Sequence, residues 1–225
     1  MRPRALISWS TGKDAAWALH VVRRAGALDV VGALTTVAPA YGRVAMHGVR
    51  TALLDRQLEG LGLPGVRVDL PVPCPNAAYE AAMGEALRAA KAEGVTHVVF
   101  GDLFLEDIRA YREAQLAPLG IEPVFPLFGE DTAALARAMI DGGLEARIAT
   151  LDPRKLPRAL AGRAFDGALL AELPADVDPC GENGEMHTLV TAGPMFAPGF
   201  RLDVEVGEVV DREGFVYADL VRPAQ

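Results

Sequence analysis

Near the amino terminus, the chain carries a short loop whose residue types suit phosphate binding. Residues 8–20 read SWSTGKDAAWALH, so a small polar loop separates an apolar run from a helical pattern. Gly12 lets the backbone approach an anion closely, Lys13 supplies a positive charge and Ser10 a hydroxyl donor. Backbone N–H groups at the start of the helix would add to such a site. We therefore predict an anion-binding loop, with Asp14 as the helix N-cap and a candidate Mg²⁺ ligand.

The spacing within this loop excludes several nucleotide-binding classes. It lacks the G-x-x-x-x-G-K-[ST] pattern of the Walker A loop, and it is not G-x-G-x-x-G. Kinases, P-loop GTPases and the common dinucleotide-dependent dehydrogenases are therefore disfavoured.

Two further segments place charged residues beside predicted element ends. His47 and Arg50 stand at the start of a predicted helix, where they suit an anionic ligand group, although a capping loop with a solvated arginine fits equally well. Gly101 and Asp102 follow a buried strand, with Glu106 about one helical turn further on. Carboxylates there would act through a metal ion or by holding ribose and ammonium groups; the alternative is ordinary loop and first-turn helix charges.

A fourth segment, DPCGENGEMHTLV at residues 178–190, crowds polar groups ahead of a strand. We interpret it as a pocket for substrate or ammonia, and a turn with incidental charges remains the alternative. Its cysteine, Cys180, has no candidate base except His187, so covalent catalysis is not predicted. With Cys74 it makes only two cysteines, too few for a disulfide scaffold or a four-ligand zinc site.

The elements that must position these residues follow an alternating pattern over the first half of the chain. Apolar runs predict strands at 5–9, 30–37, 66–70, 97–101 and 121–125, separated by helices at 14–25, 49–61, 77–92 and 106–116, the third with Asn76 as N-cap. This alternation predicts an α/β fold with a doubly wound, mostly parallel sheet. Its ligand crevice should lie at the carboxyl ends of the strands, where the first loop opens.

After residue 129 the pattern changes. A helix is expected at 132–141 with Asp131 as N-cap, then a strand at 144–151 and two short helices. Residues 201–221 alternate apolar and polar around a turn at 213–214, which is typical of strands. We predict two domains, 1–128 and 129–225, the second a smaller mixed α+β domain.

Bulk composition narrows the partners. The chain has 225 residues, 51% hydrophobic and 23% charged, with a formal net charge of -8. Without a cluster of Lys and Arg, neither nucleic acid nor an anionic membrane is an expected partner. No apolar run approaches the roughly 18 residues of a membrane span, nor does one form a signal-peptide core, so a cytoplasmic protein is expected. The sequence is compatible with a homodimer.

Taken together, S-x-G-K-D, MHGVR, GDLFLEDIRAYRE and DPCGENGEMHT resemble the diphthine-ammonia ligase family of N-type ATP pyrophosphatases, the PP-loop superfamily with a HUP-like fold. The likeness spans nearly the whole chain. Thr11 and Ala15 depart from the S-G-G-K-D-S pattern of that superfamily. Asn183 and His187 resemble the bacterial branch, since the archaeal and eukaryotic motif reads more like E-G-G-E-Y-E-T.

The resemblance implies a ligase that uses ATP and Mg²⁺. ATP would adenylate a carboxylate with release of pyrophosphate, and ammonia or another amine would displace AMP to leave an amide. The acceptor, a small molecule or a protein side chain, stays unidentified. The implied residues are, for catalysis, Lys13, Asp14 and Asp102; for ATP, Ser8, Ser10, Thr11, Gly12, Lys13, Asp14, Thr35 and Gly101; for substrate, His47, Arg50, Glu106, Glu182, Asn183, Gly184, Glu185 and His187.

Two other functions compete with this interpretation. An adenine-nucleotide sensor without turnover is motivated by Thr11 and Ala15. A tRNA-modifying PP-loop enzyme is disfavoured, because neither paired catalytic cysteines nor a basic face is present in the sequence.

Overall fold

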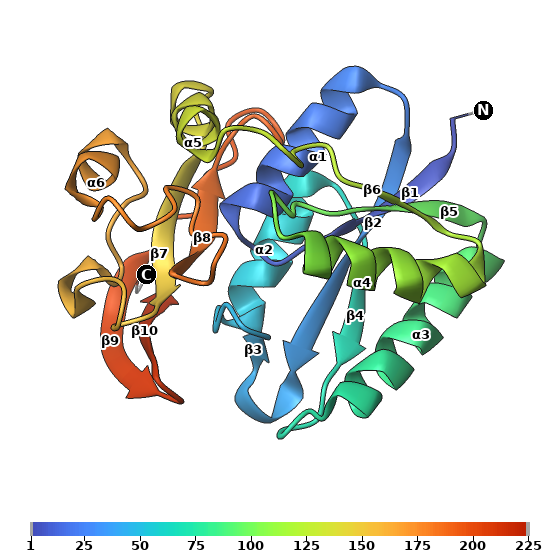
Figure 1. The fold of residues 1–225 in the computed structure, drawn as a ribbon, viewed down its shortest axis with the longest axis horizontal. Coiled ribbons are helices and arrows are strands. Elements are labelled where there is room, and N and C mark those ends of the chain that lie inside the picture. The colour runs from blue at the N-terminus through green and yellow to red at the C-terminus, as the bar shows by residue number, and fades with distance from the viewer. Residues whose placement is uncertain (1, 224–225) are drawn as a thin grey trace.

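The computed structural model describes residues 2–223, which form two β-sheets with helices packed against them (Figure 1). The first sheet has six strands: β1 (Arg4–Ser8), β2 (Asp29–Ala38), β3 (Arg43–Val44), β4 (Gly65–Asp69), β5 (Val95–Val99) and β6 (Glu122–Val124). All its pairings are parallel except that of β2 with the short β3. The predicted α/β fold with a mostly parallel sheet is confirmed, and β3 is an addition that its two-residue length concealed.

Helices cover both faces of this sheet. The four long ones are α1 (Lys13–Ala25), α2 (Thr51–Leu61), α3 (Asn76–Ala92) and α4 (Glu106–Leu116), with short 3₁₀ turns η1 (Pro39–Tyr41) and η2 (Ala117–Leu119). Side chains of a strand alternate between the faces, so Ala33 and Val37 of β2 join the core under α1 and α2. Leu34 lies instead in the core under α3.

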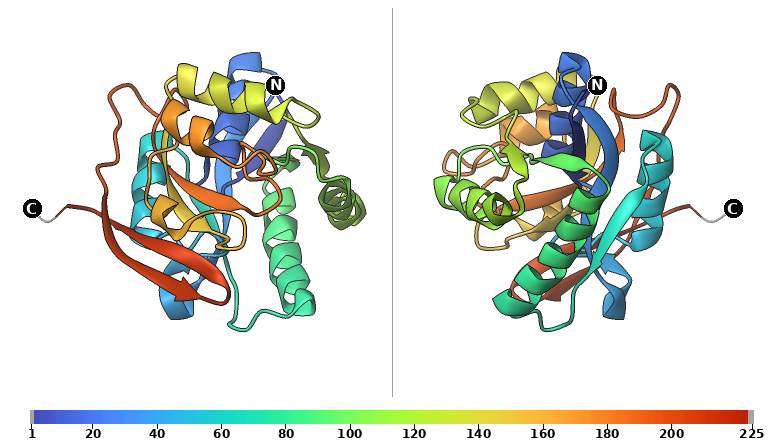
Figure 2. Two further views of the ribbon diagram at one scale, coloured as in Figure 1. Left: turned by 60° about the vertical axis from the view of Figure 1, so that its left-hand side comes forward. Right: turned by 90° about the vertical axis from the view of Figure 1, so that its right-hand side faces the viewer.

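The second sheet is antiparallel, in the order β8-β7-β10-β9. Its strands are β7 (Glu145–Leu151), β8 (Met186–Ala192), β9 (Glu205–Arg212) and β10 (Phe215–Val221), accompanied by α5 (Thr132–Asp141), η3 (Arg158–Leu160) and α6 (Gly167–Glu172). The predicted turn at 213–214 does join β9 to β10. Figure 2 shows this hairpin on the same side of the molecule as β3, and Arg43 of β3 pairs with Asp219 of β10.

One continuous apolar core runs through both halves of the chain. It contains Leu19 of α1 and Leu54 of α2 together with Leu189 of β8 and Val216 of β10. The division into domains at residues 128 and 129 therefore stays a prediction. Within residues 2–223, no helix is both long enough and apolar enough to cross a membrane.

Of the three residues predicted as helix N-caps, one is confirmed and two are wrong. Asp131 is the N-cap of α5, because its carboxylate accepts the Ala134 N–H at 2.7 Å. Asp14 is not an N-cap: α1 begins at Lys13, Gly12 holds the cap position, and the Asp14 carboxylate turns to the Lys13 ammonium instead. Asn76 is likewise already inside α3, where its amide donates to Glu80.

Candidate functional site

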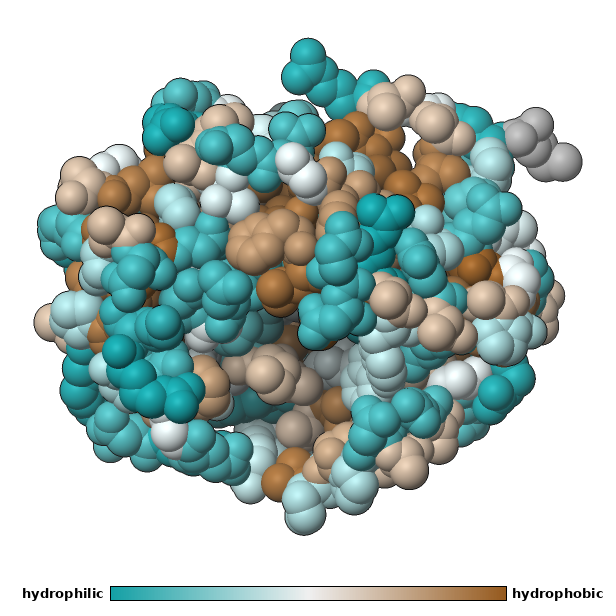
Figure 3. Space-filling model, in the orientation of Figure 1, coloured by the Kyte–Doolittle hydropathy of each residue, from teal (hydrophilic) through white to brown (hydrophobic). Residues whose placement is uncertain are grey.

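The main cavity, about 640 Å³ in volume, opens beside the carboxyl ends of β1, β2 and β5. That volume is in the range of small-molecule sites. The surface in Figure 3 is hollowed at the lower centre, where β2 and β4 reach their carboxyl ends in Figure 1. The predicted site residues that line the cavity are Ser8, Ser10, Asp14, His47, Gly101, Asp102, Glu182 and His187. Residues from both sheets thus face one space.

The central part of the first loop is covered rather than open. Thr11 and Lys13 are fully buried and, like Gly12, are not among the residues that line the main cavity. Strand β8 crosses over them: Val190 N–H donates to the Thr11 carbonyl at 3.0 Å, and Lys13 N–H donates to the Thr188 hydroxyl at 3.1 Å. The predicted nest of free amide groups is therefore reduced, since one of its donors is already bonded.

A buried glutamine ties the same loop to β8. Gln57 of α2 is wholly buried; its amide N–H groups donate to the carbonyls of Thr11 and Val190, at 3.2 and 2.7 Å, and its oxygen accepts the Trp9 indole N–H at 3.0 Å. A lone glutamine in an amphipathic helix gave no sequence signal for this role.

Gly12 is constrained by His47. A Cβ at Gly12 would lie 2.7 Å from His47 Cε1, although the Gly12 backbone, with φ of -89°, is allowed for any residue. We expect Gly12→Ala to reduce the free energy of unfolding by about 1–3 kcal/mol through this clash alone. Urea unfolding of Gly12→Ala, His47→Ala and the double variant checks it. Because the alanine at 47 vacates the space, the double variant should recover stability relative to additivity; simple additivity would contradict the steric cause.

Lys13 links the loop to the 178–185 segment. Its ammonium, 1% exposed, lies 2.9 Å from Asp14 Oδ2, donates to the Cys180 carbonyl, and sits 5.5 Å from the Phe165 ring centroid. Burial by itself would lower the pKa of Lys13, but the negative charge of Asp14 and its neighbours raises it above the usual value. The side chain is therefore a buried cation that holds both walls of the site together.

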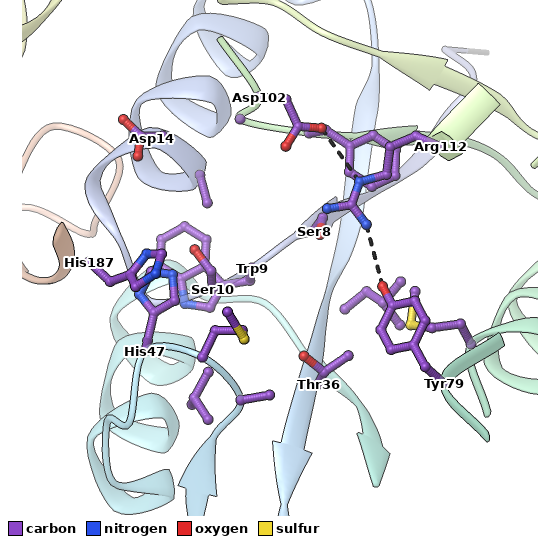
Figure 4. Close-up of a pocket in the computed structure, with 18 of the residues that line it drawn as sticks. Ser8, Trp9, Ser10, Asp14, Thr36, His47, Tyr79, Asp102, Arg112 and His187 are labelled. Carbon is purple, nitrogen blue, oxygen red and sulfur yellow. Dashed lines mark hydrogen bonds and ion pairs between the residues drawn. The ribbon is translucent and has the colours of Figure 1, made fainter. Parts of the chain in front are cut away.

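Two histidines stack on one side of the main cavity, as Figure 4 shows. The rings of His47 and His187 have centroids 4.6 Å apart at an interplanar angle of 34°. Burial lowers both pKa values, that of His187 to about 4. Both rings are therefore neutral at pH 7. Since His47 Nδ1 lies 3.2 Å from the Thr188 carbonyl, Nδ1 is the protonated nitrogen and Nε2 is a free acceptor.

The opposite side carries a charged network that sequence reasoning found in part. Arg112 of α4 lies 3.5 Å from Asp102 and donates to the Tyr79 hydroxyl at 3.4 Å (Figure 4). Arg112 and Tyr79 line the main cavity, as does Thr36, and none of the three was predicted. Arg112 lies in the segment GDLFLEDIRAYRE, one α4 turn beyond Ile108, so its helical position was available as a signal.

Gly101 lines the main cavity for a steric reason. A Cβ there would lie 2.6 Å from the Asp14 carbonyl carbon and 2.7 Å from the Ala15 nitrogen. Only glycine lets the end of β5 approach the first turn of α1 this closely.

Several predicted site residues lie outside the main cavity. Thr35 is buried on the α1–α2 face of β2, one position away from the cavity-lining Leu34 and Thr36, because side chains alternate along a strand. Arg50 pairs with Asp219 of β10, and Glu106 is exposed on α4. The remaining ones, Asn183, Gly184 and Glu185, form the turn behind the cavity, where the Asn183 amide donates to the buried Glu185.

Glu182 is a carboxyl group of the main cavity with a raised pKa. It accepts the Leu103 N–H at 2.7 Å, and burial, together with the charges of Asp14 and Asp102, raises its pKa to about 7 although the Leu103 bond and Lys13 oppose this. In the unfolded chain it would ionise near pH 4.5. The folded state therefore holds the proton more tightly, and ionisation costs stability as the pH rises from 4.5 through 7.

A glutamine at this position should remove that cost. Glu182→Gln keeps the acceptor for Leu103 but cannot ionise, so its stability relative to the wild type should increase by about 2 kcal/mol between about pH 4.5 and pH 8. Urea unfolding at both pH values measures the change, with the exposed Glu106→Gln as the matched control. A difference that is independent of pH would contradict the raised pKa.

Cys180 is unsuited to nucleophilic chemistry. It is buried, its thiol donates to the Thr132 carbonyl, and burial raises its pKa to about 12. At neutral pH the group stays a thiol. This agrees with the sequence interpretation, which assigned it no catalytic role.

Acidic side chains of the main cavity are compatible with a nucleotide-bound Mg²⁺. Within residues 2–223, no three His, Cys, Asp or Glu residues are arranged to enclose a metal ion by themselves. A phosphate-bound Mg²⁺, however, takes one or two carboxylates and fills its other positions with phosphate and water. Asp14 and Asp102 line the cavity, and burial raises the pKa of Asp102, a cost that a cation would relieve.

Comparison with known proteins bears on the second half of the chain. The family described as "Diphthamide synthase C-terminal domain" matches residues 131–222. A search of curated proteins finds no match. The matched segment contains α5, α6 and all four strands of the antiparallel sheet, together with the cavity residues Glu182 and His187. The match supports similarity to the diphthine-ammonia ligase family without distinguishing its branches, and over residues 131–222 the chain is similar to the carboxyl-terminal domain of diphthamide synthases.

Proposed function

We propose that the protein is an ATP-dependent ligase that adenylates a carboxylate and transfers the acyl group to ammonia or another amine. One observation carries the proposal. The segment that matches the diphthamide synthase domain supplies Glu182 and His187 to the same cavity that receives Ser10 and Asp14 from the first loop. A PP-loop type of ATP site in the first half is the function that the motif S-x-G-K-D favours.

The lining of the main cavity suits the purine ring and the phosphates of a nucleotide. Leu34, Met83 and Phe100 line an apolar region that suits a purine ring. The Ser10 hydroxyl lies at the amino-terminal end of α1, where the helix dipole favours phosphate. A bound Mg²⁺ would supply charge neutralisation of the phosphates, with Asp14 or Asp102 as its carboxylate ligand.

The reaction divides into two steps. The carboxylate oxygen of the acceptor attacks the α-phosphorus of ATP, and pyrophosphate leaves. The amine nitrogen then attacks the acyl carbon, AMP leaves, and the nitrogen loses a proton. The stacked histidines, neutral at pH 7, offer a free ring nitrogen, His47 Nε2, as the acceptor of that proton.

A product assay tests the proposal. ATP, ammonium and a panel of carboxylic acids are incubated with the protein, and nucleotides are separated by chromatography; AMP and pyrophosphate should appear in equal amounts. Asp102→Asn should lower the rate about tenfold or more by removing a charge from the main cavity, while Asp107→Asn, on the exposed side of α4, should not. ADP with free phosphate would refute the ligase. ATP binding measured by calorimetry without any AMP formation would indicate a sensor instead.

A further inference from the structure

A second cavity, here called the side cavity, adjoins the main one. It has a volume of about 410 Å³ and lies among β3, the connection between β4 and α3, and the β9–β10 hairpin. Five residues line both cavities: Val44, Ala45, Met46, Leu70 and Cys74. The two cavities therefore adjoin along this shared wall.

Exposed apolar side chains gather at the side cavity. Five large hydrophobic residues are exposed in the described chain, and three of them, Tyr41 (47%), Met46 (69%) and Val72 (43%), line it. Pro71 and Pro73 extend the same surface. Apolar surface that is concentrated at a concave site indicates ligand binding, whereas scattered exposed residues do not.

The residues that line the side cavity include equal numbers of cations and carboxylates. Arg43 and Asp219 form an ion pair at 2.9 Å. Arg212 stacks over the Tyr41 ring at 4.7 Å and lies 5.9 Å from the Tyr217 centroid, while Glu213 follows it in the hairpin turn. The formal charges of the two cations and two carboxylates in the lining sum to zero. Its flat, apolar walls fit an uncharged aromatic or alkyl body instead.

Met46 marks the boundary between the cavities. Its φ of 62° is in the left-handed region, which an unbranched L-residue adopts at a cost of about 1–3 kcal/mol. Strained residues of this kind concentrate at ligand sites, and a flexible thioether side chain adapts to ligands of different shape.

We propose that the side cavity binds the acceptor of the ligase reaction, a small carboxylic acid with an apolar, aromatic or alkyl body. The body lies against Tyr41 and Val72, and the carboxylate passes Met46 into the main cavity, where the nucleotide is bound. The role of this ligand as the acceptor rests on the proposed function. The binding of a ligand of this class rests on the geometry of the side cavity.

Binding can be tested without turnover. Saturation-transfer NMR with the full-length protein would use 4-phenylbutyrate as the probe. Acetate, a carboxylate without a large apolar group, is the comparison compound. We expect phenylbutyrate to bind at millimolar concentration and acetate not to bind. Val72→Trp fills the side cavity without touching the main one, and should weaken binding of phenylbutyrate about tenfold or more. Tyr41→Ala, which removes one wall, should also weaken it.

The controls separate this inference from the proposed function. Val206→Trp is the matched control, because Val206 is a similarly exposed valine (41%) that lines neither cavity. ATP affinity, measured by calorimetry, should be the same in all variants. Wild-type protein that binds no phenylbutyrate, or binding that Val72→Trp leaves unchanged, overturns the inference alone. A failure of the wild type to bind ATP overturns the ligase alone.

The alternative to a small-molecule ligand is that a second copy of the chain occupies the side cavity. If the side cavity were a contact between copies, Val72→Trp would change the oligomeric state in size-exclusion chromatography while phenylbutyrate failed to bind. That result would also overturn the proposal.

Discussion

Replacing Lys13 with methionine is expected to abolish AMP formation and to destabilise the fold. The variant removes a buried cation but leaves Asp14 and the Cys180 carbonyl without their donor. Loss of one partner from a buried ion pair costs about 3–5 kcal/mol, and we expect the lower end of that range here because Asp14 is 28% exposed. The rate of AMP formation should decrease about 100-fold or more, since the Lys13 ammonium holds in place Asp14, which lines the main cavity, and the Cys180 carbonyl of the 178–185 segment.

Two measurements separate these effects. Urea unfolding gives the change in stability, and the product assay is carried out at a temperature where circular dichroism shows the variant to be folded. Lys155→Met, at an exposed lysine outside both cavities, is the control and should change neither quantity. A folded Lys13→Met protein that forms AMP at the wild-type rate would show that the Lys13 ammonium is not needed for AMP formation and that the residue is structural.

The second large effect is expected from Gln57→Leu. Leucine has a similar volume but makes none of the three hydrogen bonds of the amide, so the Trp9 indole N–H, in a side chain that is 1% exposed, loses its partner. An unsatisfied buried polar group costs about 1–3 kcal/mol, and the loss of two further bonds brings the expected decrease in unfolding free energy to about 3–4 kcal/mol. Thermal or urea unfolding measures it.

The chain supplies a matched control for this variant. Gln115 of α4 also has a buried amide nitrogen, but it has no hydrogen-bond partner among the described residues. Gln115→Leu should therefore leave the stability unchanged or increase it slightly. Equal destabilisation by both substitutions would indicate a general intolerance of leucine, and not the loss of the Gln57 bonds.

These effects differ in how far the sequence predicted them. The alternation of apolar runs and helical patterns predicted the mostly parallel sheet, because buried parallel strands and amphipathic helices have different periods. The Asp131 cap was also readable, since a cap requires only residues a few positions apart. For Asp14 the local rule failed, because the adjacent Lys13 ammonium is the stronger partner in a buried site.

The sequence did not decide which side chains of a strand face the main cavity. Residues 33–35 of β2 are all buried, so the burial pattern did not distinguish its two faces; Thr36 lines the main cavity, and the predicted Thr35 does not. Arg50 was assigned to the site from its place near a helix start. Its guanidinium binds Asp219 of β10, a carboxylate 169 positions away in the chain.

The sequence by itself determined the α/β class of the first half, the turn between β9 and β10, and the polar character of the loop at residues 10–14 and of the segment at 178–190. These follow from local backbone preference and from periodic burial, which nearby residues suffice to set. Only the tertiary structure decided that β8 covers the first loop, that Gln57 and Lys13 hold the two together, and that a side cavity opens beside Met46. The Lys13 N–H and Thr188 are 175 positions apart, and such contacts arise from how whole faces pack, which no local pattern encodes.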